Sequence, residues 1–389
     1  MKQVVLFIFF LSTEAFFGQS VARTYQFKAD IENSIKNDSA VWKYQTGATQ
    51  FAFSGYYQEV LNTWDKNGSK KPKTTLSDSL FFVNSQKVNA KDYIIDQAKN
   101  NTIVIINEAH HLAKHRKFTT SMLQDLYDIG YRYFGVEALF DAEINDRKYP
   151  TQDSGYYTKE PEFGNLLAEA LKIGFTLFGY EANELQNAKQ REIEQAQNIQ
   201  TFIKNNPPGK VIIYCGYAHA FENDYPAWEK AMAARLKEAT QIDPFTIDQT
   251  MILERANPQN NHLFMRLNTT DQPLVLISNN GLVYRGASAK YQTDVVLIYP
   301  ETNVVNQRPS WLVQNRVKHS VILPENTKDS SFLVLAYREN EFQKNGIPAD
   351  IIEINSKTDA NNLYLAKGNY WIVIQDKNYD VVKQYLAKI

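Results

Sequence analysis

The residues best suited to chemistry lie in one stretch, residues 102–118, which reads TIVIINEAHHLAKHRKF. It contains a glutamate, an arginine and three of the six histidines of the chain: Glu108, His110, His111, His115 and Arg116. A histidine that is neutral near pH 7 abstracts a proton from water, and a neighbouring carboxylate orients it. The water then attacks a carbonyl carbon, and Arg116 or Arg191 stabilises the developing oxyanion. This pattern predicts a hydrolytic site.

The same residue types also suit a metal ion. The candidate ligands are His110, His115, His219 and Glu137, a nitrogen and oxygen set suited to Zn, Mn, Fe or Co with an open position for water. The chain has no His-Glu-x-x-His arrangement around these residues. The spacing therefore leaves metal-dependent and metal-free chemistry both open.

Strand ends position these side chains. The apolar run at residues 103–106 predicts a strand buried on both faces, and further strands are predicted at residues 133–136, 175–179 and 211–215. Glu108, Glu137, Glu181 and His219 follow these four strands in turn. Because parallel strands place their carboxyl ends at one edge of a sheet, we expect the four side chains to converge there.

Segments of helical periodicity separate the strands. Helices are predicted from about residue 118 to Gly130, over residues 163–171 up to Gly174, and over residues 185–204 and 226–237, with another strand near residues 246–253. Strands that alternate with helices in this way predict the α/β class, a mostly parallel sheet flanked by helices. A smaller β-rich domain is expected to follow it.

The chain divides into four expected parts. Residues 1–22 have a basic start and a short apolar run, which predicts a signal peptide and an exported, soluble protein, periplasmic or extracellular, with no transmembrane segment after cleavage. Residues 23–100 form a helical, aromatic-rich extension, 101–260 the α/β domain with the site, and 261–389 the β-rich domain. In the last part we expect a hairpin around Asn279-Asn280-Gly281, and strands at residues 295–299, 317–323, 331–337, 351–354 and 370–374.

Composition excludes several classes of function. The 389 residues carry 42 Lys and Arg against 43 Asp and Glu with no long basic run, so no nucleic-acid partner is expected. Cys215 is the single cysteine, which excludes an intrachain disulfide, and its place in the fourth strand predicts a buried small hydrophobe. The chain has neither a Gly-x-Ser-x-Gly elbow nor a glycine-rich phosphate loop after a strand.

The motifs in residues 102–254 resemble the erythromycin-esterase-like superfamily, which includes ChaN-type haem-binding uptake proteins, TraB proteins and Tiki proteases. The tail resembles that of uncharacterised exported members, with residues 307–312 as a signature stretch. The resemblance matches family positions to Glu108 and His110, with His111 competing, and to His115, Glu137, Arg191 and His219. Asn107 stands where the family has Gly, and its side chain would narrow the approach of a substrate to the backbone.

We therefore expect an exported hydrolase that activates water with His110 or His115, assisted by Glu108 and Glu137, against an ester or amide. His219 would be a second base or electrophile and Arg191 an anion partner, whereas the substrate would contact His111, Arg116 and Glu181. The resemblance also implies an alternative, a haem- or iron-binding uptake protein of ChaN type. A third possibility is a non-catalytic binding module. The partner is accordingly a small-molecule substrate or haem.

Overall fold

The computed structural model describes residues 23–68, 75–137, 139–183, 187–286, 291–305, 308–325, 331–355 and 361–389. The expected signal peptide at residues 1–22 and Gln307 of the expected signature stretch lie outside these ranges. Within them, no helix combines the length and the apolar character needed to cross a membrane.

A six-stranded parallel sheet forms the centre of the α/β part, which confirms the predicted fold class. All six residues of β2 are buried, as expected for a strand covered on both faces. The order across the sheet is β10 (Val295–Val296), β8 (Phe245–Asp248), β2 (Ile103–Glu108), β5 (Lys210–Gly216), β3 (Tyr131–Val136) and β4 (Thr176–Gly179).

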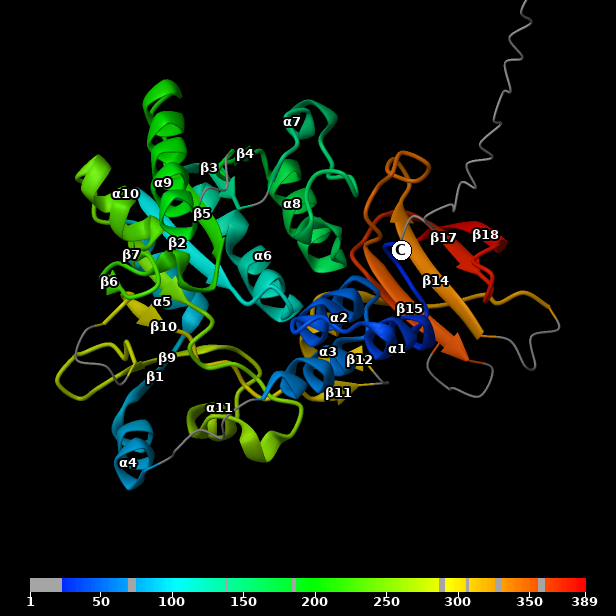
Figure 1. Ribbon diagram of the computed structural model, residues 1–389, viewed down its shortest axis with the longest axis horizontal. Helices are drawn as coiled ribbons and strands as arrows, with labels where there is room; N and C mark the ends of the chain where they lie inside the picture. The colour runs from blue at the N-terminus through cyan, green and yellow to red at the C-terminus, as the bar shows by residue number, and fades with distance from the viewer. Residues whose placement is uncertain are drawn as a thin grey trace, which may run out of the picture.

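Helices cover both faces of this sheet (Figure 1). One face packs against α5 (Ala90–Ala98), α6 (Ala113–Asp128) and α8 (Pro161–Ile173), through a core that includes Ile106, Met122 and Leu167. The other face packs against α9 (Ala188–Asn205) and α10 (Met232–Thr240), through a core that includes Ile105, Ile199 and Leu236. Successive β2 side chains therefore enter different cores, as strand geometry requires.

Two predicted elements of the α/β part differ in the structure. The helix predicted at residues 226–237 begins only at Met232, because β6 (Asp224–Tyr225) and β7 (Glu229–Lys230) form a short hairpin that brings the Trp228 ring onto His219. The strand predicted near residues 246–253 ends at Asp248. Its carboxylate accepts the backbone N–H groups of Thr250 and Met251 and so turns the chain.

The β-rich part is a four-stranded antiparallel sheet with a two-stranded ribbon packed on one face. Phe332 and Val334 of the central strand point to the ribbon, whereas Leu333 and Leu335 point to Tyr25, Phe27 and Phe53 near the N-terminus. The sheet order is β15 (Asp350–Asn355), β14 (Ser331–Arg338), β17 (Asn369–Gln375) and β18 (Val381–Lys388), and the ribbon is β13 (Val317–Ser320) with β16 (Asn362–Leu365). Prediction missed β16 and β18.

Several elements join the two parts. The strand predicted at residues 295–299 appears as β10 and extends the parallel sheet, and β1 (Gln86–Asn89) pairs with β9 (Leu274–Ile277), the first arm of the predicted hairpin. The helices α1 (Lys28–Asn37), α2 (Lys43–Phe53) and α3 (Tyr57–Trp64) lie between the α/β part and the C-terminal sheet (Figure 1). The remaining α-helices and strands are α4 (Leu76–Asn84), α7 (Ile144–Arg147), α11 (Leu263–Leu267), α12 (Ser310–Val313), β11 (Val304–Val305) and β12 (Arg308–Pro309).

The corner between α2 and α3 provides a test of how the N-terminal helices dock. Gly55 has φ +78° there, and a Cβ on it would lie 2.7 Å from the Ile351 carbonyl oxygen of β15. We expect Gly55→Ala to lower the free energy of unfolding by about 2–4 kcal/mol, from backbone strain plus the forced separation of β15.

Urea denaturation measures this loss, and Gly68→Ala is the matched control. Gly68 has φ +84°, but a Cβ there meets no atom of the described residues within 4 Å, so only the strain of about 1–2 kcal/mol remains. Equal losses in the two variants would contradict the proposed contact with β15.

Candidate functional site

Four strand ends meet at one edge of the parallel sheet, and Arg191 on the first turn of α9 ties three of them together. Its guanidinium donates to Glu137 at 2.5 Å and to Glu181 at 2.6 and 2.8 Å. A third nitrogen lies 3.1 Å from His219 Nε2. The structure thus brings together Glu137, Glu181, Arg191 and His219, which are far apart in sequence.

Glu108 and His110 form the fourth wall of the site. Glu108 Oε1 lies 2.9 Å from His110 Nδ1, and the same carboxylate accepts two bonds of 2.6 Å from Arg116 and one of 2.8 Å from the Tyr214 hydroxyl. Burial acts to raise the pKa of Glu108, but Arg116 and His110 lower that pKa far below its usual range. Because an ionised carboxylate only accepts, Nδ1 carries the proton and Nε2 keeps a free lone pair.

Gly216, the last residue of β5, allows His110 and Glu137 to approach the same point. A Cβ on Gly216 would lie 2.3 Å from His110 Nε2 and 3.2 Å from Glu137 Oε2. The Gly216 N–H donates to Glu137 Oε2 at 2.5 Å. Only glycine leaves room for this arrangement, in which a basic nitrogen and a carboxylate lie over one backbone segment.

The charges around Glu137 set opposite protonation states for it and for His219. Burial acts to raise the pKa of Glu137, but His219, His110 and Arg191 with the Gly216 N–H lower it to about 2. Burial lowers the pKa of His219, but Glu137 and Glu192 more than offset this and raise it. His219 Nδ1 lies 2.9 Å from Glu192 Oε2, so this histidine, like His110, has a glutamate behind Nδ1.

Aromatic rings hold both histidines in place. The His110 ring stacks on Tyr157 at 3.9 Å and 12°, and the His219 ring stacks on Trp228 at 4.9 Å and 11°. Tyr217 meets the His110 ring edge-on at 5.3 Å. Its φ of +41° is strained for a tyrosine, a conformation that occurs preferentially at functional sites.

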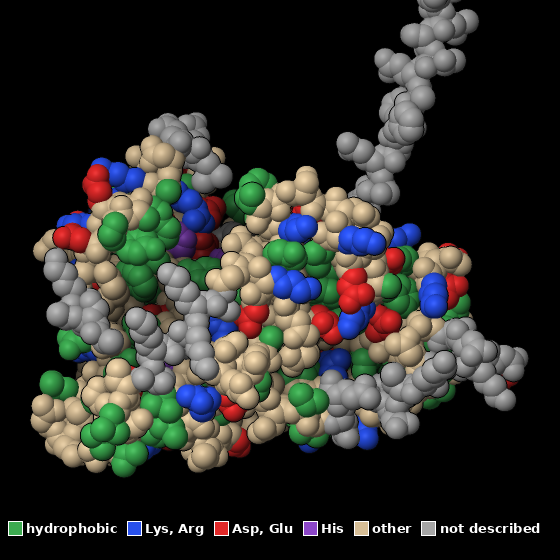
Figure 2. Space-filling model, turned by 60° about the horizontal axis from the view of Figure 1, so that its bottom comes forward, with side chains coloured by type: hydrophobic (Ala, Val, Ile, Leu, Met, Phe, Trp, Pro, Cys, Tyr) green, Lys and Arg blue, Asp and Glu red, His purple; other side chains and the backbone are tan. Residues whose placement is uncertain are grey.

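Solvent reaches two side chains of the site. The His110 side chain is 18% exposed and the Arg191 side chain 25%, whereas the carboxylates behind them are buried. Figure 2 shows histidine and acidic side chains together in a recess of the molecular surface. The site can therefore admit water and part of a substrate, while its charged groups stay fixed by the protein.

Two predicted histidines lie elsewhere. His111 is buried, and its ring stacks on Trp64 with the ring centroids 3.7 Å apart. Its Nδ1 forms a hydrogen bond of 3.2 Å with the Tyr217 hydroxyl. His115 is fully buried, its Nδ1 accepts the Ala109 N–H at 3.1 Å, and burial lowers its pKa to about 3. Of His110 and His111, the two candidates for the motif histidine, His110 lies beside Glu137 and His111 is buried against Trp64. His115 also lies inside the protein.

Asn107, the departure from the expected motif, is also used internally. Its side-chain amide donates to the Tyr217 carbonyl at 2.7 Å and to Asp248 Oδ1 at 2.9 Å, and its oxygen accepts the Gln249 N–H at 2.7 Å. Alternation along β2 directs Asn107 and Glu108 to opposite faces. The asparagine therefore ties the ends of β2, β5 and β8 together.

Sequence reasoning missed two glutamates that support the site. Glu192 was visible only as the neighbour of Arg191, and Glu160 only as the residue before Pro161 at the start of α8. Glu160 Oε2 accepts from Arg116 at 3.0 Å and from the Phe163 N–H at 2.9 Å. Burial raises the pKa of Glu160 to about 7, although Arg116 opposes the rise.

The residues present do not fit a divalent metal. Among the residues that the structure describes, no three His, Cys, Asp or Glu side chains are arranged to hold one. The Arg191 guanidinium is bonded to Glu137 and Glu181 and lies 3.1 Å from His219 Nε2, so these candidate ligands already face a fixed positive charge.

Comparison with known proteins shows only remote likeness. No family model and no curated protein matches the sequence. Solved structures with similarity include the type III effector HopBA1 (TM-score 0.38, 13% identity, 57% of this chain and 98% of that one). A second is the MARTX toxin effector domain RRSP from Vibrio vulnificus CMCP6 (TM-score 0.31, 15% identity, 67% of this chain and 50% of that one). A third is ChaN of Campylobacter jejuni, which binds haem cofacially (TM-score 0.28, 11% identity, 56% of this chain and 94% of that one). At these TM-scores the similarities indicate neither a ligand nor an activity for this protein.

The raised pKa of Glu160 predicts a pH-dependent stability. The pKa of Glu160 is about 7 in the folded protein, against an ordinary 4.5. Its contribution to the free energy of unfolding is therefore full below pH 4.5 and is lost as pH rises through 7. As pH rises over this range, the free energy of unfolding of the wild-type protein should fall by up to about 3 kcal/mol relative to that of Glu160→Gln, at 1.36 kcal/mol per pKa unit.

Urea titrations between about pH 4 and 8.5 measure this difference. Glu169→Gln on the same helix is the control, because Glu169 is a surface residue paired with Lys172. A difference between wild type and Glu160→Gln that does not change with pH would show that Glu160 titrates normally.

Proposed function

We propose that this protein hydrolyses a neutral ester or amide, with a water molecule activated by His110 Nε2. The observation that carries the proposal is the position of His110, which is bonded at Nδ1 to ionised Glu108 while Nε2 lies over Gly216 opposite Glu137. This is the geometry of a general base, since the carboxylate selects the tautomer with a free Nε2. The expected signal peptide would place the reaction outside the cytoplasm.

The reaction uses the two histidines in opposite roles. His110 Nε2 takes a proton from water while the water oxygen bonds to the carbonyl carbon, and Glu108 stabilises the imidazolium that results. His219, whose pKa Glu137 and Glu192 raise against burial, supplies a proton to the departing oxygen or nitrogen. Pairs of titratable groups whose surroundings shift their pKa values differently are typical of acid and base partners.

Arg191 and Glu137 orient the reacting groups. The guanidinium is partly exposed and held by Glu137 and Glu181, so it can stabilise an oxyanion without moving. Glu137 accepts the Gly216 N–H and stays ionised, which favours the protonated His219 beside it.

The balance of charge favours a neutral substrate. Four carboxylates, those of Glu108, Glu137, Glu181 and Glu192, surround two guanidinium groups and His219. Because the carboxylates outnumber these cations, the site repels an anionic substrate. A neutral ester, lactone or amide meets no such barrier.

We expect His110→Gln to lower kcat by about 10²- to 10⁴-fold, because general-base catalysis contributes that much. Stopped or continuous assays on a panel of neutral nitrophenyl esters, lactones and anilides provide the measurement. His319→Gln is the matched control, since His319 lies on β13 and contacts Tyr385.

Two results would contradict the proposal. The first is wild-type protein inactive on the whole panel, and the second is His110→Gln with unchanged kcat. A haemin titration of the same proteins separates the alternative, because a Soret shift abolished by His110→Gln would instead favour haem binding.

A further inference from the structure

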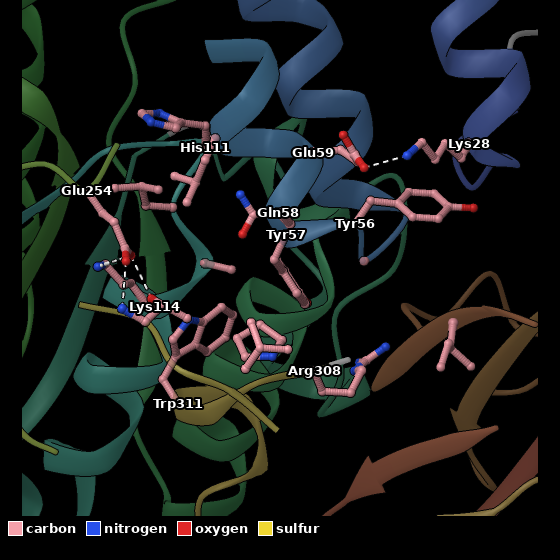
Figure 3. A pocket seen from close by; sticks show the side chains of 18 of the residues that line it. Lys28, Tyr56, Tyr57, Gln58, Glu59, His111, Lys114, Glu254, Arg308 and Trp311 are labelled. Atoms are coloured by element: carbon pink, nitrogen blue, oxygen red, sulfur yellow. Dashed lines mark hydrogen bonds and ion pairs between the residues drawn. The ribbon is translucent and has the colours of Figure 1, made fainter. Parts of the chain in front are cut away.

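A second cavity, of about 420 Å³, lies outside the site described above (Figure 3). It lies where α3, the start of α6 and the region around α12 and β15 meet, so residues from three distant parts of the chain form its walls. Its size is typical of pockets that bind small molecules. Neither His110 nor Glu137 lines it.

The cavity has an aromatic corner. The rings of Tyr57 and Trp311 lie 4.9 Å apart at 70°, which presents two ring faces nearly at right angles. Leu61, Leu112 and Ile352 add apolar surface. A flat ring can stack on one face and meet the other edge-on, the arrangements that aromatic rings prefer.

Each cation of the walls is paired with a carboxylate, and Glu353, the remaining carboxylate of the walls, accepts from the Tyr56 hydroxyl and the Lys28 backbone N–H. Lys28 binds Glu59 at 2.5 Å and Lys114 binds Glu254 at 2.6 Å, and Figure 3 shows the two pairs on opposite sides of the cavity. Arg308 binds Asp350. Since each cation already has its carboxylate, the cavity favours a ligand without charge.

A chain of contacts leads from this cavity to His110. The Tyr57 hydroxyl donates to Glu160 Oε1 at 3.4 Å, and Glu160 accepts from Arg116 at 3.0 Å. Arg116 binds Glu108, which orients His110 Nδ1. A ligand that moves the Tyr57 ring therefore acts on the group that holds the imidazole in place.

We propose that this cavity binds a neutral aromatic compound of two or three rings, and that its occupation changes the environment of His110 through Tyr57, Glu160 and Arg116. The binding needs no hydrolytic activity in the other site. It adds to the proposed function a separate ligand site with a physical connection to the base.

A matched pair of fluorescent probes tests the binding. N-phenylnaphthylamine is neutral, and anilinonaphthalene sulfonate adds an anionic sulfonate to the same rings. We expect saturable fluorescence enhancement with the neutral probe, and affinity about tenfold weaker or worse for the sulfonate because the cations of the cavity are paired. Equal or tighter binding of the sulfonate would overturn the assignment to a neutral ligand.

Three variants locate the probe. Trp311→Ala removes one ring face and should weaken binding of the neutral probe by about tenfold, and Gln58→Trp, on an exposed residue of the wall, should fill the space and abolish binding. Trp42→Ala, on a tryptophan that is exposed outside the cavity, should leave binding unchanged. If all three variants bind the neutral probe like wild type, the cavity is not its site.

Imidazole nitrogen NMR on histidine-labelled protein tests the connection without an activity assay. The chain has six histidines, so the His110 signals can be assigned by comparison with His110→Gln. Saturation with the neutral probe should shift them, and Tyr57→Phe should bind the probe but lose the shift, because only the hydroxyl bond to Glu160 is removed. Bound probe with unmoved His110 signals in wild type would overturn the connection.

Discussion

The buried ion pair between Arg116 and Glu108 is the interaction on which the rest of the site depends. Both side chains are 1% exposed, and the arginine spans from the end of β2 to the start of α8 through Glu160. Removing two charges from water opposes folding unless hydrogen bonds satisfy both groups. Here Tyr214, the His110 carbonyl and Glu160 complete those bonds. The pair thereby keeps Glu108 ionised, and an ionised Glu108 determines which nitrogen of His110 is free.

The parallel sheet explains why the acids and histidines of the site come from separate segments. Each strand supplies one short stretch at its carboxyl end, and the neighbouring strands place those stretches side by side. Arg191 and Gly216 complete the arrangement in different ways. Arg191 binds the glutamates at two strand ends and lies beside His219 at a third, and Gly216 leaves space between two strand ends. The result is two histidines, each backed by a glutamate and stacked on an aromatic ring, on either side of Glu137.

The segments outside the sheet also reach the site. Trp64 of α3 stacks on His111, and Tyr57 of the same helix contacts Glu160, while the preceding helices pack on the C-terminal sheet through Phe27 and Phe53. The N-terminal helices therefore contact both Glu160, which supports the site, and the β-rich part. The second cavity lies where these three regions of the chain meet. Its connection to His110 runs through side-chain contacts of Tyr57, Glu160 and Arg116.

The sequence by itself determined the α/β class, the four strands that supply the site and the burial of Cys215 in β5, because hydrophobic runs report directly which residues a strand buries. It also showed that acids and histidines follow those strands. Only the tertiary structure shows where the His110 and His111 side chains lie, because the residues after a strand end have no repeating geometry and their direction depends on Arg116, Tyr157 and Trp64. The roles of Glu160 and Glu192, the pairing of β1 with β9 and the late start of α10 were equally inaccessible. Each depends on a contact between segments distant in the chain, and local periodicity carries no information about such contacts.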